Sequence, residues 1–127
     1  MFTPAQLARW NKAQNSKEPV EVVTLEEAKA AEKQKSDKKK TWIFKADNVR
    51  DFAWGSSRKF IWDALATKIQ GRRVMVRGLS QRSFYGLYRK LSSKVVEHTI
   101  QTYSKFTIPY PYPVAQSIEA LMEWNTR

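Results

Sequence analysis

The chain has 127 residues, 42% of them apolar and 13% aromatic, a globular composition that excludes disorder over the whole length. Its 23 lysines and arginines outnumber 12 acidic residues, and the formal charge of +11 permits attraction to nucleic acid, an acidic membrane surface or an acidic partner. The chain contains no cysteine, which excludes disulfides, thiol catalysis and cysteine metal sites, and no stretch approaches the roughly 18 apolar residues of a membrane span.

The first 34 residues predict a helix, a short strand and a second helix. Thr3 is placed as an N-cap with Pro4 at the first helical position, so a helix is expected over residues 3–14. The β-branched run Val20–Val23 predicts a strand. Thr24 with Glu27 three residues later forms a capping box for a helix over residues 25–34.

Residues 41–78 predict four strands. Apolar side chains alternate with other residues in TWIFKADN and again in KFIWDAL, so one face of each strand can be buried. The pair Gln70-Gly71 separates ATKI from RRVMVRG, which is typical of a hairpin turn. The aromatic residues expected on the buried faces are Trp42, Phe44, Phe60 and Trp62.

From Ser80 the apolar spacing changes to three and four residues, which favours one long amphipathic helix. Its expected apolar positions are Phe84, Leu87, Tyr88, Leu91, Val95, Tyr103 and Phe106. The prolines of IPYPYP end the helix, and VAQSIEA predicts a terminal strand. The fold class is therefore α+β: a small, mostly antiparallel sheet with flanking helices, then a long amphipathic helix and a terminal strand.

The residues do not form a complete active site. His98 is the one histidine, and with no second histidine to complete H-E-x-x-H we expect it to be a partly exposed helix residue. Glu26 and Glu27 are explained as acids in the first turn of a helix. The four glycines are too scattered to form a phosphate-binding loop.

A small basic nucleic-acid-binding module is the alternative function. The lysine-rich run 33–40 and the basic residues of the strand region could contact phosphates while tryptophans stack on bases. These basic residues are Arg58, Lys59, Lys68, Arg72, Arg73 and Arg77. However, the aromatic residues occupy the alternating positions of a core, which favours packing over stacking. Nucleic acid is therefore not the expected partner.

Two stretches carry a resemblance to a known family. NVRDFAW at residues 48–54 and TIPYPYPVAQSIEA at residues 107–120 resemble the aminopeptidase-N-like zinc peptidases, the gluzincin aminopeptidases. The resemblance implies that residues 1–79 are the C-terminal part of a β-rich N-terminal domain. Residues 80–120 would begin the catalytic domain with a long helix, a Pro-Tyr arm and a strand.

The resemblance also implies that the chain lacks the catalytic centre. The family binds zinc through H-E-x-x-H and a further glutamate, which are absent here, so zinc and peptide substrates belong to the intact parent. Codons permitted for residues 121–127 read N-G-M-E-Y-P, the family's substrate-binding segment, when entered two bases late. We therefore expect these residues to be an out-of-frame tail. Glu123 resembles the glutamate that holds the substrate's amino group, and the frame argument attributes this match to coincidence.

A part of a larger protein should expose surfaces that the rest would cover. We expect apolar faces on the strands around Trp42 and Phe60 and on the long helix, and from them poor stability or non-specific self-association.

Overall fold

A computed structural model describes residues 2–34, 39, 41–51, 53–81 and 87–119, with the backbone alone for residues 87–90. These residues form an α+β fold, as predicted. In chain order the elements are α1 (Pro4–Ala13), β1 (Val20–Val23), α2 (Leu25–Lys33), β2 (Phe60–Ile69), β3 (Arg72–Gln81), α3 (Leu87–Phe106) and β4 (Val114–Ile118). Within the described residues, no helix is long and apolar enough to cross a membrane.

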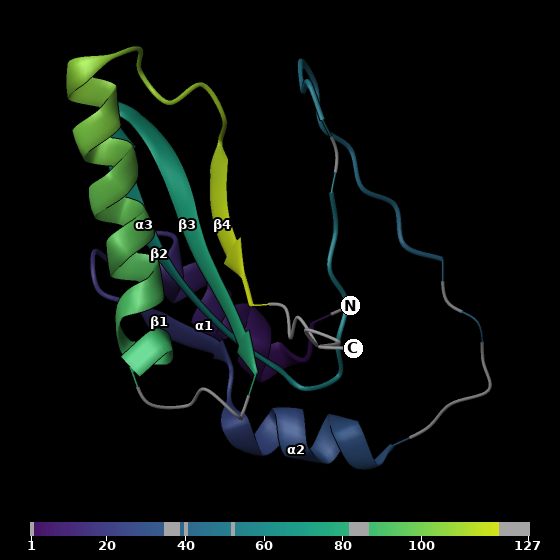
Figure 1. Ribbon diagram of the computed structural model, residues 1–127. Helices are drawn as coiled ribbons and strands as arrows, with labels where there is room; N and C mark the ends of the chain where they lie inside the picture. The colour runs from purple at the N-terminus through teal and green to yellow at the C-terminus, as the bar shows by residue number, and fades with distance from the viewer. Residues whose placement is uncertain (1, 35–38, 40, 52, 82–86, 120–127) are drawn as a thin grey trace, which may run out of the picture.

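The four strands form one mixed sheet in the order β1-β2-β3-β4 (Figure 1). Strands β1, β2 and β3 are antiparallel neighbours, whereas β4 runs parallel to β3 after the crossover through α3. The predicted hairpin is confirmed, because Ile69 pairs with Arg72 across the turn. Gln70 and Gly71 have φ angles of 48° and 78°, the left-handed conformation of a tight hairpin turn.

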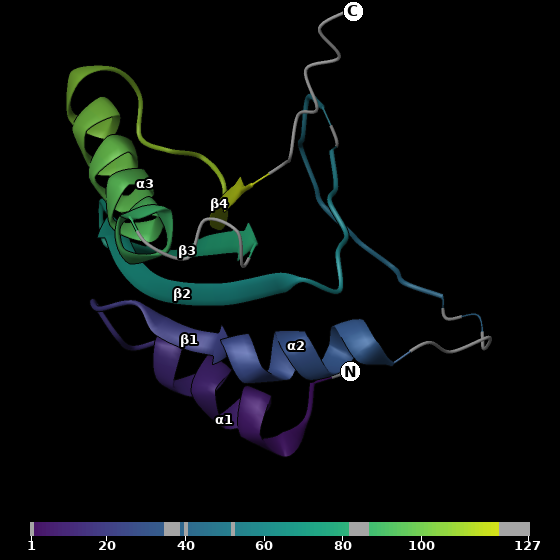
Figure 2. The same cartoon turned by 60° about the horizontal axis from the view of Figure 1, so that its bottom comes forward.

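Helices cover both faces of the sheet, with α3 on one side and α1 and α2 on the other (Figure 2). Alternate residues of each strand therefore enter two different cores. The core under α3 contains Leu65, Ile69, Val74, Val76, Ile100 and Ala115. The core under α1 contains Ala13, Val22, Ala64 and Met75, with Trp10, Val20, Trp62, Ala66 and Val114 packed against them.

Capping and one ion pair tie the N-terminal elements together. Thr3 and Thr24 both form the capping boxes that begin α1 and α2, and the prediction for Thr24 and Glu27 is confirmed. Arg9 of α1 donates to both carboxylate oxygens of Glu27 at 2.6 Å, and its Nε donates to the carbonyl of Val22. Glu27 thus joins α1, β1 and the start of α2.

Replacement of Glu27 by glutamine should lower the free energy of unfolding by about 1 kcal/mol at pH 7, because a charge-assisted bidentate contact is lost. Burial works to raise the pKa of Glu27, but hydrogen bonds from Arg9 and Thr24 outweigh it and lower this pKa. The stabilisation is therefore present at neutral pH and is lost as the pH falls below about 4.5, the ordinary value. Urea unfolding from pH 3 to 7 measures this; a constant difference between the two proteins would contradict it.

The structure corrects the predicted strand region. Residues 41–78 were expected to form four strands, but only β2 and β3 form there among the described residues. Trp42 and Phe44 are not core residues, since they are 67% and 62% exposed. Alternation indicates a strand only where a neighbouring strand supplies hydrogen bonds, and none lies beside residues 41–46.

The structure also corrects the long helix. Ser80, its expected start, lies in β3 opposite Ile61, and the described helix begins at Leu87. The predicted apolar positions Leu91, Val95, Tyr103 and Phe106 are exposed, which agrees with the expectation of an uncovered apolar face on this helix. The face of α3 toward the sheet instead carries Ser92, Ser93, Val96 and Ile100. A spacing of three and four residues identifies an apolar face of a helix. It does not show whether that face packs against the sheet or points away from it. Phe84 lies outside the described residues.

Candidate functional site

The residues that sequence analysis singled out for chemistry do not come together in the described structure. His98 is exposed on α3, as predicted. No group of three or more histidine, aspartate or glutamate side chains able to hold a metal ion occurs among the described residues. Glu123 lies outside the described residues, so its predicted substrate contact stays a prediction.

A buried polar cluster lies between α3 and the sheet. Ser93 of α3 donates its hydroxyl to Oδ2 of Asp63 on β2 at 2.5 Å, and both residues are buried. Ser80 and Ser92 are also buried, and their hydroxyl oxygens have no partner among the described residues. We call Asp63, Ser92 and Ser93, which meet beside Gly78, the Asp63 cluster. No histidine or lysine of the described residues bonds to the Asp63–Ser93 pair, so it lacks a base to activate a nucleophilic serine.

The Asp63 cluster fits only because position 78 is glycine. A Cβ at Gly78 would lie 2.5 Å from Oδ1 of Asp63, 2.7 Å from Oγ of Ser93 and 2.9 Å from Oγ of Ser92. The cluster therefore packs against bare backbone of β3. Burial raises the pKa of Asp63, and the hydrogen bond from Ser93 opposes this rise.

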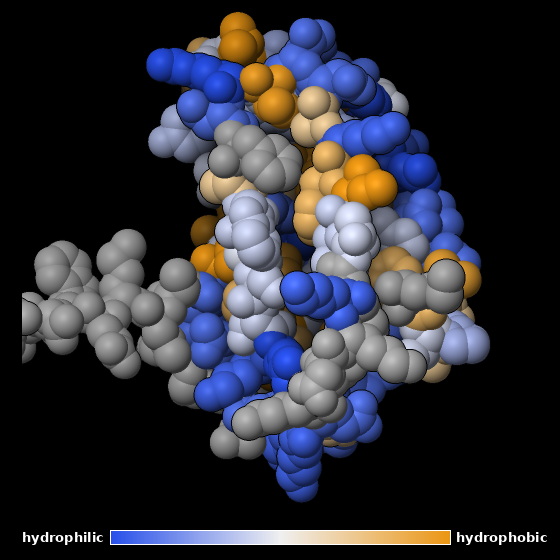
Figure 3. Space-filling model, turned by 90° about the vertical axis from the view of Figure 1, so that its right-hand side faces the viewer, coloured by the Kyte–Doolittle hydropathy of each residue, from blue (hydrophilic) through white to orange (hydrophobic). Residues whose placement is uncertain are grey.

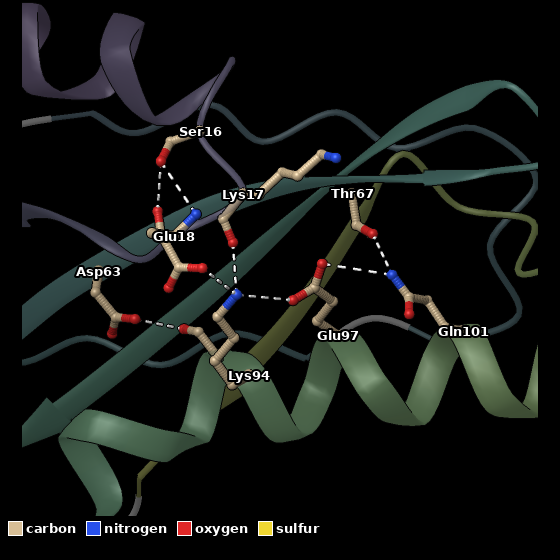
Figure 4. Close-up of polar contacts among 9 residues, drawn as sticks. Ser16, Lys17, Glu18, Asp63, Thr67, Lys94, Glu97 and Gln101 are labelled. Carbon is tan, nitrogen blue, oxygen red and sulfur yellow. Dashed lines mark hydrogen bonds and ion pairs between the residues drawn. The ribbon is translucent and has the colours of Figure 1, made fainter.

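A polar seam next to the Asp63 cluster holds α3 against the loop after α1 (Figure 4). Nζ of Lys94 donates to the carbonyl of Lys17 at 2.6 Å and also reaches Glu18 and Glu97, at 3.2 and 3.4 Å. Burial works to lower the pKa of Lys94, but these carboxylates outweigh it and raise this pKa. Seven residues further along α3, about two helical turns, Gln101 donates to Thr67 of β2 at 2.7 Å. The seam positions the helix and leaves no reactive group free.

A cation–aromatic cluster lies on the other face of the sheet. The rings of Phe2, Trp10 and Trp62 pack together, with centroids 5.4 Å apart for both Phe2–Trp62 and Trp10–Trp62. The guanidinium carbon of Arg77 lies 4.9 Å from the ring centroid of Trp10 and 5.6 Å from that of Trp62. We call these four residues the Arg77 cluster. Cation–π attraction stabilises the charge here only in part.

The Arg77 cluster contains two buried donors without acceptors. Nε of Arg77 and Nε1 of Trp62 are both buried and have no hydrogen-bond partner in the part of the chain that the structure describes. Arg77 forms no ion pair with any described residue, and burial lowers its pKa. A buried donor without an acceptor costs about 1 to 3 kcal/mol. Native proteins rarely retain two such groups side by side without a partner, so this cluster is the candidate binding site.

A largely apolar cavity of about 820 Å³ adjoins the Arg77 cluster. Its wall includes six aromatic residues, Phe2, Trp42, Phe44, Trp54, Phe60 and Trp62, and four aliphatic ones, Val23, Ala28, Ala31 and Leu79. The cavity and the cluster share Phe2 and Trp62. Apolar side chains lie among hydrophilic ones on the surface that Figure 3 presents, which is the side of the molecule occupied by residues 41–57.

The basic residues considered for nucleic acid serve different local roles. Arg58 donates to the carbonyl of Gln34, and Arg72 donates to the carbonyls of Tyr110 and Pro111. Nζ of Lys59 lies 3.5 Å from Oε1 of Glu32, as an exposed ion pair. Lys68 and Arg73 are exposed cross-strand partners. Among the aromatic residues, Trp62 packs against the core under α1, as predicted. Trp42 and Phe44 were also expected to pack in a core and not to stack on bases, but both are exposed.

Sequence reasoning placed Arg77 among basic surface residues and gave Asp63 no role. The available signal was the alternation in β2 and β3, which puts Asp63 and Arg77 within strands and on opposite faces. It could not show that both faces are covered. Comparison with known protein families, with curated proteins and with solved structures finds no match for this chain.

Proposed function

We propose that this chain is a scaffold portion of a zinc metallo-aminopeptidase of the aminopeptidase-N-like family, and that it contributes no metal ligand and hydrolyses no peptide alone. The observation that carries the proposal is the sequence of residues 48–54 and 107–120, which resembles the family at two separate points. In that family, a long helix leads through a Pro-Tyr arm into a strand. The order α3, Pro109–Pro113, β4 agrees with this expectation.

Exposed apolar side chains in the same stretches support a scaffold role. Trp54 and Ile108 are 69% and 73% exposed, so the residues that carry the resemblance are not all used in this chain's own core. The outward stripe of α3 ends in Phe106, which is 82% exposed. The exposed apolar side chains along one face of α3 are typical of a surface that another part of a protein covers.

The role of the chain in peptide hydrolysis would be positional. In the intact parent, the bound zinc polarises the scissile carbonyl and lowers the pKa of a water molecule. The sheet and α3 would hold the substrate-binding strand that follows β4. Two hydrogen bonds fix the helix relative to that sheet: Ser93 donates to Asp63 of β2, and Gln101 donates to Thr67 of β2.

The nucleotide sequence tests the proposal directly. The DNA that encodes residues 121–127 should read N-G-M-E-Y-P in the shifted frame, with H-E-x-x-H further downstream. A coding sequence that gives neither motif in any frame would overturn the proposal. The purified chain should also release no amino acid from aminoacyl-p-nitroanilides, with or without added zinc.

Non-specific self-association is also expected of this scaffold. The purified chain should show a weight-average mass that rises with concentration in sedimentation equilibrium, because exposed Ile43, Phe106 and Ile108 favour contact between copies. The change Phe106→Ser should reduce this association, while Lys105→Ser, at the neighbouring exposed position, should not. A cooperative melt from a monomer at high concentration would contradict the expectation.

One observation keeps a nucleic-acid-binding module as the second candidate. Lys68 and Arg73 are cross-strand partners, and like charges placed opposite each other destabilise a strand pair unless an anion lies between them. Neither forms an ion pair with a described residue. Oligonucleotide binding with a slope of several charges in a plot of log affinity against log salt would favour this candidate. The scaffold proposal expects no such binding at physiological salt.

A further inference from the structure

We propose that the Arg77 cluster and the adjoining cavity bind an extended polypeptide segment that carries one carboxylate between apolar side chains, with the carboxylate paired to Arg77. The proposal rests on the structure of this surface and does not depend on the peptidase resemblance. It assigns a partner class to the unpaired charge of Arg77, which forms no ion pair with a described residue.

The unpaired positive charge of Arg77 favours a partner that carries a carboxylate. Its guanidinium lies on two tryptophan rings, and no described carboxylate pairs with it. Nε is buried, whereas the terminal nitrogens are not among the buried, unpartnered atoms and so can be reached from outside. A carboxylate there would neutralise the cation in a site from which aromatic rings exclude water, where a charge-assisted hydrogen bond is strong.

The groups around Arg77 call for apolar neighbours on the same partner. The ring of Trp62 forms both the support for the guanidinium and part of the cavity wall. Leu79 lines the cavity two residues along β3 from Arg77, and therefore on the same face of the strand. Side chains two residues before and after a carboxylate in an extended peptide would reach such a wall.

The part of the wall formed by Trp42, Phe44 and residues 54–57 argues for a polypeptide rather than a small amphiphile. Residues 41–46 and 53–56 have no regular secondary structure, and their backbone groups form no hydrogen bond to another described residue. Figure 1 shows this part of the chain running beside the sheet without joining it. An extended backbone with free donors and acceptors can form hydrogen bonds with the backbone of an added peptide strand. The hydrocarbon chain of a fatty acid cannot form these hydrogen bonds.

The test uses two peptides that differ in one group: acetyl-Ser-Leu-Thr-Glu-Thr-Leu-Ser-amide and the same peptide with glutamine in place of glutamate. Binding to the full chain is followed by the indole N–H resonance of Trp62, assigned with the variant Trp62→Phe. The glutamate peptide should bind about tenfold more tightly than the glutamine peptide. It should also shift the Trp62 resonance downfield as that donor gains an acceptor.

Variants at the cation separate charge pairing from general adhesion. Arg77→Met should abolish the difference between the two peptides without unfolding the chain, because removing an unpaired buried charge is neutral or stabilising. Arg77→Gln provides the same comparison if the methionine variant misfolds. Arg73→Met, at an exposed arginine of β3 that does not line this cavity, is the matched control and should keep the difference.

Three outcomes would overturn the proposal. The first is that the two peptides bind equally or do not bind at all. The second is that the difference in affinity between the two peptides survives Arg77→Met. The third is that decanoate binds tightly while neither peptide binds, which would identify a site for a small amphiphile. Retention of the peptide difference in Arg73→Met together with its loss in Arg77→Met supports it.

Discussion

The variant Gly78→Ala is expected to lower the free energy of unfolding by about 3 kcal/mol, as an overpacked core does. The added methyl group would meet Asp63, Ser93 and Ser92 at distances between 2.5 and 2.9 Å, closer than carbon–oxygen contacts allow. These oxygens cannot retreat easily, because α3 holds the two serines and β2 holds the aspartate. Urea unfolding followed by circular dichroism measures the change.

A second glycine provides the control. A Cβ at Gly55 would meet the side chain of Ile118 at 3.1 Å, and a flexible aliphatic side chain can move aside, so Gly55→Ala should cost less than about 1 kcal/mol. The double variant Gly78→Ala, Asp63→Ala should lose less stability than the sum of the single variants, because the shortest contact is gone. Equal effects at the two glycines would refute the packing argument.

The variant Asp63→Asn is expected to raise the free energy of unfolding at pH 7 by about 1 to 2 kcal/mol. Asparagine keeps the acceptor for Ser93 and removes a buried carboxylate charge that no described cation pairs with. Because burial raises the pKa of Asp63 in the folded state, the wild-type chain loses stability as the pH rises from about 3.8, the ordinary value, through the folded pKa. The gain in the variant should therefore be small at pH 3.5 and full at pH 7.

An exposed aspartate controls for this pH dependence. Asp51→Asn removes a carboxylate at an exposed position and should leave the unfolding curve unchanged across the same pH range. The profile of Asp63 has the opposite sign to that of Glu27, whose ion pair stabilises the fold above pH 4.5. If Asp63→Asn were destabilising at pH 7, the carboxylate would have to be doing more for the cluster than accepting one hydrogen bond.

Local signals in the sequence predicted local structure well. The N-cap at Thr3, the capping box at Thr24 and the turn at Gln70-Gly71 depend on residues no more than three apart, and all three occur as expected. The ends of α1, β1 and α2 were therefore predictable to within about one residue. Pro109 and its neighbours also ended α3 before Thr107, as predicted.

Features that depend on distant parts of the chain were not predictable. Residues 41–46 alternate like a strand, yet whether a neighbouring strand lies beside them is a property of the whole fold. The parallel pairing of β4 with β3 and the orientation of α3 have the same origin. The predicted stripe of α3 faces outward because the sheet side is occupied by the small Ser92 and Ser93, which bring the helix close to the Asp63 cluster.

The candidate site depends on the same long-range information. Arg77 was recognised as a basic residue near tryptophans, but the lack of a paired acid appears only once α1 is placed over β2 and β3. The functional proposal rests on residues 48–54 and 107–120, where the resemblance depends on which amino acids occur and not on the spacing of apolar residues.

Strand β3 divides the sheet into two halves that form by different routes. On one side it pairs along its whole length with β2 across a two-residue turn, so this half closes a minimal loop. On the other side it meets β4 only after α3 has crossed over, with Leu79 and Ile118 as partners 39 positions apart in the sequence. Because closing a longer loop costs more chain entropy, the hairpin can nucleate early, whereas α3 and β4 dock late and detach first during partial unfolding.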